Sequence, residues 1–222
     1  MYRAVLLDVY GTLVHEDDAV LGPICEQIAR LAQVQTPVVA ELWWRLFQQA
    51  NEESHGETFR LQADLSRDTL AVTLRQLGVA ADADRLCEAQ FEFWRRPPIF
   101  SDSLPFLKQV GVPVCLVSNI DRDHLDAAMT HHDVVVTAVV TSQDARAYKP
   151  RPEPFELAVQ ALGVTTSDVL HAGDSLTADV AGAAALGIKS AWINRSGRPL
   201  PAGPTPTHTA TKLTELLPML QG

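Results

Sequence analysis

The chain has 222 residues, 46% of them hydrophobic and 20% charged, a composition that supports a large core and excludes disordered and fibrous proteins. Twenty-seven acidic against eighteen basic residues give a net charge of −9, which argues against a nucleic acid or an anionic membrane as partner. No apolar run approaches the ~18 residues of a membrane span, and the sequence shows neither a signal-peptide pattern nor cysteines at disulfide or zinc spacing. We expect a cytoplasmic monomer or homodimer.

The first half of the chain predicts one buried strand followed only by helices. The apolar run from Ala4 to Val9 ends at the turn residues Gly11 and Thr12, as a buried strand does. Apolar residues at helical spacing then recur up to a double proline at 97–98. The expected helices begin near Asp17, at Thr36 as N-cap, at Ser66 and at Asp82. Residues 15–98 are therefore predicted to form a helical insertion.

After the double proline, predicted strands alternate with predicted helices. Strands are expected within 113–118, 134–141, 169–172 and 189–193, and helices over 104–110, 123–129, 154–162, 179–186 and 211–217. Strands separated by helices of this length require right-handed crossovers, so we predict an α/β fold with a mostly parallel sheet and helices on both faces. The Pro-, Gly- and Thr-rich segment 196–209 is expected to be a surface loop.

Polar side chains gather at the ends of the predicted strands, where open parallel sheets bind ligands. They are, in chain order, Asp8, Ser118, Asn119, Lys149, Asp174 and Asp179. A carboxylate at the end of the first strand can attack phosphorus or an sp³ carbon and form an ester. Several carboxylates at one edge repel each other unless a divalent cation such as Mg²⁺ neutralises them. Taken singly, each residue also fits a turn cap, a helix N-terminus or a solvated surface position.

Four segments in this order resemble the motifs of the haloacid dehalogenase superfamily. They are Asp8-Val9-Tyr10-Gly11-Thr12-Leu13, Ser118-Asn119, Lys149-Pro150, and Gly173-Asp174-Ser175 with Asp179. The resemblance extends from residue 3 to about residue 194. It implies a Rossmann-like core, residues 1–14 and 99–222, and an inserted α-helical cap, residues 15–98.

The resemblance also implies roles for individual residues. Asp8 corresponds to the nucleophile, while Ser118 and Lys149 hold the transferred group and balance its charge. Mg²⁺ is expected on Asp8, Asp174, Asp179 and the backbone carbonyl of Tyr10. Gly11, Thr12 and Asn119 are expected to bind substrate, and Tyr10 occupies a catalytic position.

Tyr10 departs from the phosphatase pattern. Phosphatases of this superfamily usually carry a second aspartate there as general acid and base, and a phenol with a pKa of about 10 is a poor base near neutrality. Tyr10 instead resembles the 2-haloacid dehalogenases, in which halide leaves without protonation. Those enzymes need no metal, whereas this chain keeps the metal-binding Asp174. Those enzymes also use a cap arginine, whereas this chain has Asn51-Glu52-Glu53 near the matching position, and Arg45 or Arg60 would have to substitute for the arginine.

We weigh the retained Asp174 more heavily than Tyr10. The leading hypothesis is therefore a Mg²⁺-dependent phosphatase that acts on a small phosphate monoester through an aspartyl-phosphate at Asp8. The alternatives are a metal-independent 2-haloacid dehalogenase and a phosphate-binding protein with little turnover. In the cap, Trp43 is expected in the core, whereas Trp44 falls off the apolar stripe and is a candidate for a pocket, an interface or the surface.

Overall fold

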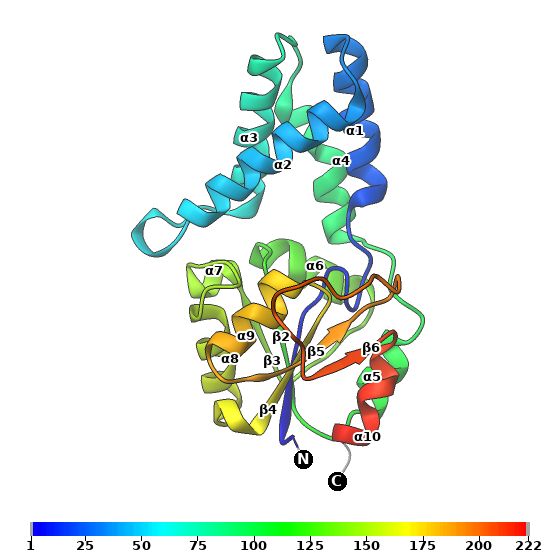
Figure 1. Cartoon of the computed structure of the whole chain (residues 1–222), viewed down its shortest axis with the longest axis vertical. Coiled ribbons are helices and arrows are strands. Elements are labelled where there is room, and N and C mark those ends of the chain that lie inside the picture. Colours follow the sequence, from blue (N-terminus) through cyan, green and yellow to red (C-terminus); the bar gives the residue numbers. More distant parts are fainter. Residues whose placement is uncertain (1, 221–222) are drawn as a thin grey trace.

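The computed structural model describes residues 2–220, which form a six-stranded sheet flanked by helices and a separate group of helices beside one end of the sheet (Figure 1). The strands are β1 (Ala4–Leu7), β2 (Val114–Ser118), β3 (Ala138–Thr141), β4 (Val169–Gly173), β5 (Lys189–Ile193) and β6 (His208–Ala210). They lie in the order β3-β2-β1-β4-β5-β6, and every strand pair is parallel. This arrangement confirms the predicted α/β fold.

Helices cover both faces of the sheet because the side chains of β1 alternate between two apolar cores. Val5 and Leu7 face one core, and Ala4 and Leu6 face the other. The helices are α5 (Ser103–Gln109), α6 (Arg122–His131), α7 (Ser142–Ala145), α8 (Glu153–Leu162), α9 (Gly182–Ala185) and α10 (Leu217–Leu220). Side chains of α5, α6 and α10 contribute to the first core, and those of α8 and α9 to the second. β1 is paired on both sides, so Asp8 follows a central strand.

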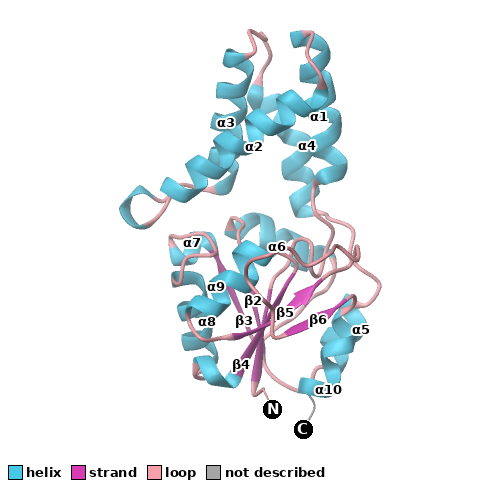
Figure 2. Ribbon diagram, viewed as in Figure 1, coloured by secondary structure: helices cyan, strands magenta, loops and turns pink. Residues whose placement is uncertain are grey.

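Four helices, which we call the cap helices, pack on one another beyond the carboxyl ends of the strands (Figure 2). They are α1 (Asp18–Ala32), α2 (Thr36–Glu53), α3 (Gln62–Gln76) and α4 (Ala83–Arg95). α4 begins as expected after Asp82, whose side chain accepts from the amides of Asp84 and Arg85. α2 includes Thr36 as its first residue, and Gln35 rather than Thr36 is the N-cap.

The cap helices join the sheet through two chain segments that lie side by side. Val14 pairs with Ile99 in an antiparallel bridge, and the amide of His15 donates to the carbonyl of Pro98 at 2.9 Å. A third contact comes from Asp121 after β2, whose carboxylate accepts from the backbone amides at the start of α3 at 2.8 and 2.9 Å. The cap helices are thus held directly over the strand ends.

The structure differs from the sequence-based elements in several places. The expected loop 196–209 ends in a short strand, β6, which adds to the edge of the sheet at β5. α3 begins at Gln62 rather than Ser66, because the carboxylate of Asp121 binds its first amides. The expected helix 179–186 begins earlier, as a π-helical turn over Leu176–Ala181 that continues into α9. None of the helices within residues 2–220 combines the length and apolar character needed to cross a membrane.

Candidate active site

The carboxyl ends of β1, β2 and β4 bring the predicted residues to one place. Asp8 follows β1, Ser118 ends β2, and Asp174 and Asp179 follow β4. Carboxylate oxygens of Asp8, Asp174 and Asp179 lie within 4.8 Å of one another. The expected convergence of the three acids is therefore present in the structure.

Lys149 joins two of these acids. Its ammonium is almost fully buried and donates to Asp8 Oδ1 at 2.8 Å, Asp179 Oδ1 at 2.6 Å and the Val117 carbonyl at 2.8 Å. Burial alone would lower the pKa of Lys149, but the charges of Asp179 and Asp8 outweigh it and raise the pKa above its ordinary value. The lysine is therefore charged near neutral pH, and all three of its donors are used.

The side chain of Asn119, an expected substrate-binding residue, forms hydrogen bonds with the backbone of Lys149. Its amide nitrogen donates to the Lys149 carbonyl at 2.9 Å, and its amide oxygen accepts from the Lys149 amide at 2.7 Å. This paired contact fixes the loop that carries the lysine. In this structure Asn119 positions Lys149, and substrate contact by its side chain remains a proposal.

Asp179 is held by protein donors at both oxygens. Oδ1 accepts from Lys149 and from His171 Nε2 at 2.9 Å, and Oδ2 accepts from the Ser175 amide at 3.0 Å. Burial would raise the pKa of Asp179, but the charge of Lys149 and the hydrogen bond from His171 outweigh it and hold the pKa well below its usual range. Because its oxygens already have donors, Asp179 fits the role of an anchor for Lys149 better than that of a direct metal ligand.

His171 was missed by the sequence analysis. It lies in the middle of β4, is completely buried, and packs edge-on against Phe155 with ring centroids 5.0 Å apart. A histidine inside the otherwise apolar strand Val169-Leu170-His171-Ala172-Gly173 is the signal that would have found it, because a buried polar side chain needs a partner.

We expect His171→Leu to lower both the free energy of unfolding and the turnover number. The substitution removes one donor to the Asp179 carboxylate, and losing a hydrogen bond to a charged group lowers the free energy of unfolding by about 2 kcal/mol. It also frees Asp179 to turn away from Lys149, which lowers the turnover number. Urea unfolding and steady-state kinetics measure the two effects. His171→Gln keeps an N–H donor and should recover most of the turnover; equal turnover in the wild type and the leucine variant would show that the contact does not position Asp179.

Asp8 and Asp174 are the carboxylates that remain available to a ligand. Asp8 Oδ2 is buried and has no hydrogen-bond partner within the described residues. Burial and the charges of Asp8 and Asp179 raise the pKa of Asp174 to about 8. A Cβ on Gly11, whose φ is +88°, would lie 2.6 Å from the Asp174 carboxyl carbon, so only glycine lets this acid approach the turn. The two carboxylates form an oxygen-rich cradle that fits Mg²⁺.

The Tyr10 side chain points away from this cradle. Its hydroxyl donates to the backbone carbonyl of Trp94, at the end of α4, at 2.5 Å. Burial and the charges of Asp17 and Asp8 raise its pKa above the ordinary value. The phenol is therefore engaged as a donor and kept neutral. The hydroxyl of Thr12, in the same turn, is buried without a partner in the described part of the chain and remains available to a ligand.

Arg198 is a second basic residue at the site, in addition to Lys149, and the sequence analysis did not identify it. Its guanidinium donates to the Asp174 carbonyl at 3.0 Å and lies 3.8 Å from the Asp174 carboxylate. It follows β5 in the segment expected to be only a surface loop. Of the two cap arginines considered, Arg60 pairs with Asp68 at 2.5 Å and Arg45 lies exposed on α2. The basic partners of Asp8 and Asp174 thus come from the core side in the described structure.

Comparison with known proteins gives likenesses of two kinds. The sequence is 30% identical to (S)-2-haloacid dehalogenase of Pseudomonas sp. (strain YL), and the match covers 99% of this chain and 94% of that protein. It is 31% identical to phosphoserine phosphatase of Thermus thermophilus, but over 55% of this chain and 51% of the other. The crystal structure of an L-2-haloacid dehalogenase shares the fold with a TM-score of 0.81 and 24% identity, covering 100% of this chain and 99% of the other.

The similarity to a dehalogenase extends over more of the chain than the similarity to a phosphatase. The dehalogenases match over whole chains, whereas this phosphatase relative matches over about half, so the preference for a phosphatase is not supported over the dehalogenase alternative. A family model described as haloacid dehalogenase-like hydrolase matches residues 2–187. Because this match covers most of the chain and agrees with the full-length relatives, the chain belongs to the haloacid dehalogenase-like hydrolases.

Proposed function

We propose that this hydrolase uses Asp8 to displace halide from a small 2-haloacid. The observation that carries the proposal is the engagement of Tyr10: its hydroxyl binds the Trp94 carbonyl, so the position two residues after the nucleophile supplies no acid to a leaving group. Halide leaves as an anion and needs none. The full-length likeness to 2-haloacid dehalogenases supports the same substrate class.

In this proposal each oxygen of Asp8 has a separate task. Oδ1 is held by Lys149, whereas Oδ2 has no partner among residues 2–220 and acts as the nucleophile. Oδ2 attacks C2 of the haloacid, the carbon–halogen bond breaks, and halide leaves with the bonding pair. Water then adds to the carboxyl carbon of the Asp8 ester, and the bond from this carbon to the C2 oxygen breaks. One proton of the water goes to the released 2-hydroxy acid and the other to solvent, which restores the carboxylate. Lys149 orients Asp8 throughout, and Arg198 supplies positive charge for the substrate carboxylate.

Chloride release tests the proposal. The protein is incubated with (S)-2-chloropropionate in EDTA, and chloride is measured over time. We expect release that depends on the enzyme and persists without divalent metal. The absence of chloride release from this acid and of bromide release from its bromo analogue would contradict the proposed function.

A Mg²⁺-dependent phosphatase is the second candidate, and the cradle of Asp8 Oδ2 and Asp174 favours it. When bound there, Mg²⁺ would neutralise negative charge on a phosphoryl group and on the acids. Asp174 must lose its proton to bind the ion, so affinity for Mg²⁺ is expected to rise as the pH passes upward through about 8. Calorimetric titration with Mg²⁺ between about pH 6 and pH 9 measures this; a pH-independent affinity would remove Asp174 from the ligands.

Asp174→Ser separates the two candidates. Serine removes the Asp174 carboxyl, which the proposed dehalogenation does not use, so a dehalogenase should keep its chloride release. A phosphatase should instead lose its Mg²⁺-dependent release of phosphate from p-nitrophenyl phosphate, by about 100-fold or more if a metal ligand is lost. Asp123→Ser, an exposed acid on α6, is the matched control and should change neither activity. Loss of chloride release in Asp174→Ser alone would count against the dehalogenase.

A further inference from the structure

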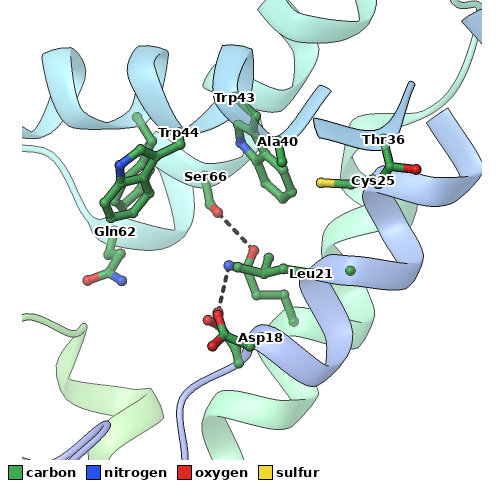
Figure 3. A pocket seen from close by; sticks show the side chains of 13 residues that line it. Asp18, Leu21, Cys25, Thr36, Ala40, Trp43, Trp44, Gln62 and Ser66 are labelled. Atoms are coloured by element: carbon green, nitrogen blue, oxygen red, sulfur yellow. Dashed lines mark hydrogen bonds between the residues drawn. The ribbon is translucent and has the colours of Figure 1, made fainter. Parts of the chain in front are cut away.

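The cap helices enclose a cavity of about 400 Å³ that is separate from the nucleophile. Figure 3 shows Trp43 and Trp44 of α2 on one side of it and Leu21 and Cys25 of α1 on the other. Trp43 is buried, as expected of a core residue, whereas Trp44 is 62% exposed. The described residues that line the cavity all belong to segment 17–90, so the cavity is not part of the Asp8 site.

The turn that carries Asp8 is held from the core side by Arg195. Within the turn, the Val9 carbonyl accepts from the amides of Thr12 and Leu13 at 3.2 and 2.7 Å. Thr12 is completely buried, so its own carbonyl needs a donor from another part of the chain. Arg195 supplies this donor, because its Nη2 lies 2.6 Å from the Thr12 carbonyl oxygen.

Arg195 is itself fixed by an acid and a ring. Its guanidinium donates to both carboxylate oxygens of Asp102, at 2.9 and 3.3 Å, and lies over the Phe100 ring, 3.8 Å from the ring centroid. Burial would raise the pKa of Asp102, but the hydrogen bonds from Arg195 and from the Leu213 amide outweigh it and hold the pKa below its usual value. Asp102 is therefore charged near neutral pH. The planar fork of arginine can serve this carboxylate and the Thr12 carbonyl together.

Arg195 and Arg198 belong to one turn after β5, which the buried Asn194 closes. The amide nitrogen of Asn194 donates to the Arg198 carbonyl at 2.8 Å, and its amide oxygen accepts from the Arg198 amide at 2.9 Å. From this turn, Arg195 reaches the Thr12 carbonyl and Arg198 reaches the Asp174 carbonyl. A single turn therefore contacts both loops whose acids are available to a ligand.

We propose that Arg195 is a positioning residue for the nucleophile: by binding the Thr12 carbonyl, it fixes the turn that orients the Asp8 carboxylate. Without Arg195, the buried carbonyl lacks its donor and the turn must shift to find another. A displacement of about 1 Å at a reacting atom can lower the rate about 100-fold. Because it takes Asp8 as the nucleophile, the inference rests on the proposed function, and it applies equally to attack on carbon or on phosphorus.

Amide hydrogen exchange and steady-state kinetics test this role in Arg195→Met. Exchange of the amides within residues 9–14 should become at least about 10-fold faster, because the turn loses a hydrogen bond to a charged group. The kcat for chloride release should fall about 100-fold, while KM changes by less than about threefold. Arg195→Lys keeps the charge beside Asp102 but lacks the fork that serves two acceptors, so its loss of kcat should be only about 10-fold.

Arg67→Met is the matched control. Arg67 also pairs with two acids, Asp64 at 3.1 Å and Asp84 at 3.3 Å, and its guanidinium lies 4.7 Å from the centroid of the Phe91 ring. All three of these partners lie in the cap helices. The control should therefore change neither the exchange within residues 9–14 nor kcat.

The exchange measurement keeps this inference apart from the proposed function, because it requires no turnover. Faster exchange in Arg195→Met, with no chloride or phosphate release by the wild type, would sink the proposed function and support the contact between Arg195 and the turn. Unchanged exchange and kcat in folded Arg195→Met would overturn the inference, as would an equal loss of kcat in Arg67→Met. If Arg195→Met does not fold, Arg195→Lys carries the same test, and unchanged exchange and kcat in that variant would overturn the inference.

Discussion

Replacing Lys149 with methionine is expected to destabilise the protein by about 3–5 kcal/mol and to abolish turnover. Removing one partner of a buried ion pair leaves its charge uncompensated, which is the most costly way to break such a pair. Here one ammonium serves both Asp8 and Asp179, at 2.8 and 2.6 Å. Methionine fills similar space but donates to neither. Chemical denaturation gives the change in the free energy of unfolding, and chloride and phosphate assays give the turnover.

The pH dependence of this loss identifies its cause. The raised pKa of Lys149 means that its favourable contribution is fully present near neutrality and below. In the methionine variant the unpaired acids take up protons as the pH falls, so the stability deficit should shrink toward acid pH. Lys189→Met, on the exposed end of β5, is the matched control and should change stability by less than about 0.5 kcal/mol. A deficit that stayed constant with pH would indicate lost packing rather than unpaired charge.

Asp8→Asn is expected to lose activity without losing stability. An amide cannot form the ester, so turnover should fall by at least about 10³-fold, as in other enzymes deprived of their nucleophile. Burial raises the pKa of Asp8, so at neutral pH its charged form is less stable in the folded chain than in the unfolded chain. The neutral asparagine relieves that cost and keeps an oxygen for Lys149, so the free energy of unfolding should remain within about 1 kcal/mol of the wild type.

Single-turnover assays and thermal melting distinguish this result from simple unfolding. Asp123→Asn, on the exposed face of α6, controls for the loss of one acidic charge and should retain full activity. If Asp8→Asn kept a tenth or more of the wild-type turnover, the ester would have to form on another residue. If it unfolded, the Asp8–Lys149 pair would be a structural requirement and the nucleophile would need a chemical trapping experiment.

The sheet was predictable from the sequence because its strands are buried on both faces. Residues 169–172 and 189–193 are short apolar runs next to glycine or turn residues, and the observed strands match them within one residue. β6 was not predictable: it has three residues, and its pairing with β5 depends on the path of the preceding loop. The start of α3 was misplaced for a similar reason, because its first amides bind Asp121, which is 59 residues away from Gln62.

The sequence predicts which residues meet at the candidate site, because the order of strands and polar residues along the chain determines this. Asp8 follows one strand of the parallel sheet and Ser118 ends another, and this alone brings them to a common edge. The sequence could not assign partners within the site: Asn119 binds the backbone of Lys149, and Tyr10 binds the Trp94 carbonyl in the cap helices. Those contacts depend on how loops and helices meet in space. Arg198 had no local signal, since its position follows from the turn after β5.

The paired segments between the cap helices and the sheet make the insertion removable as a unit. Val14 and Ile99 are bridged, and the neighbouring His15 and Pro98 share a hydrogen bond of 2.9 Å. The chain therefore leaves the core and returns to it at adjacent points, which a tight two-residue reverse turn of the kind that joins antiparallel strands could connect. The apolar side chains of α6 that pack on α4 would then need a new cover. A different module can be inserted at this junction, in evolution or by protein engineering, without changing the order or direction of the strands in the sheet.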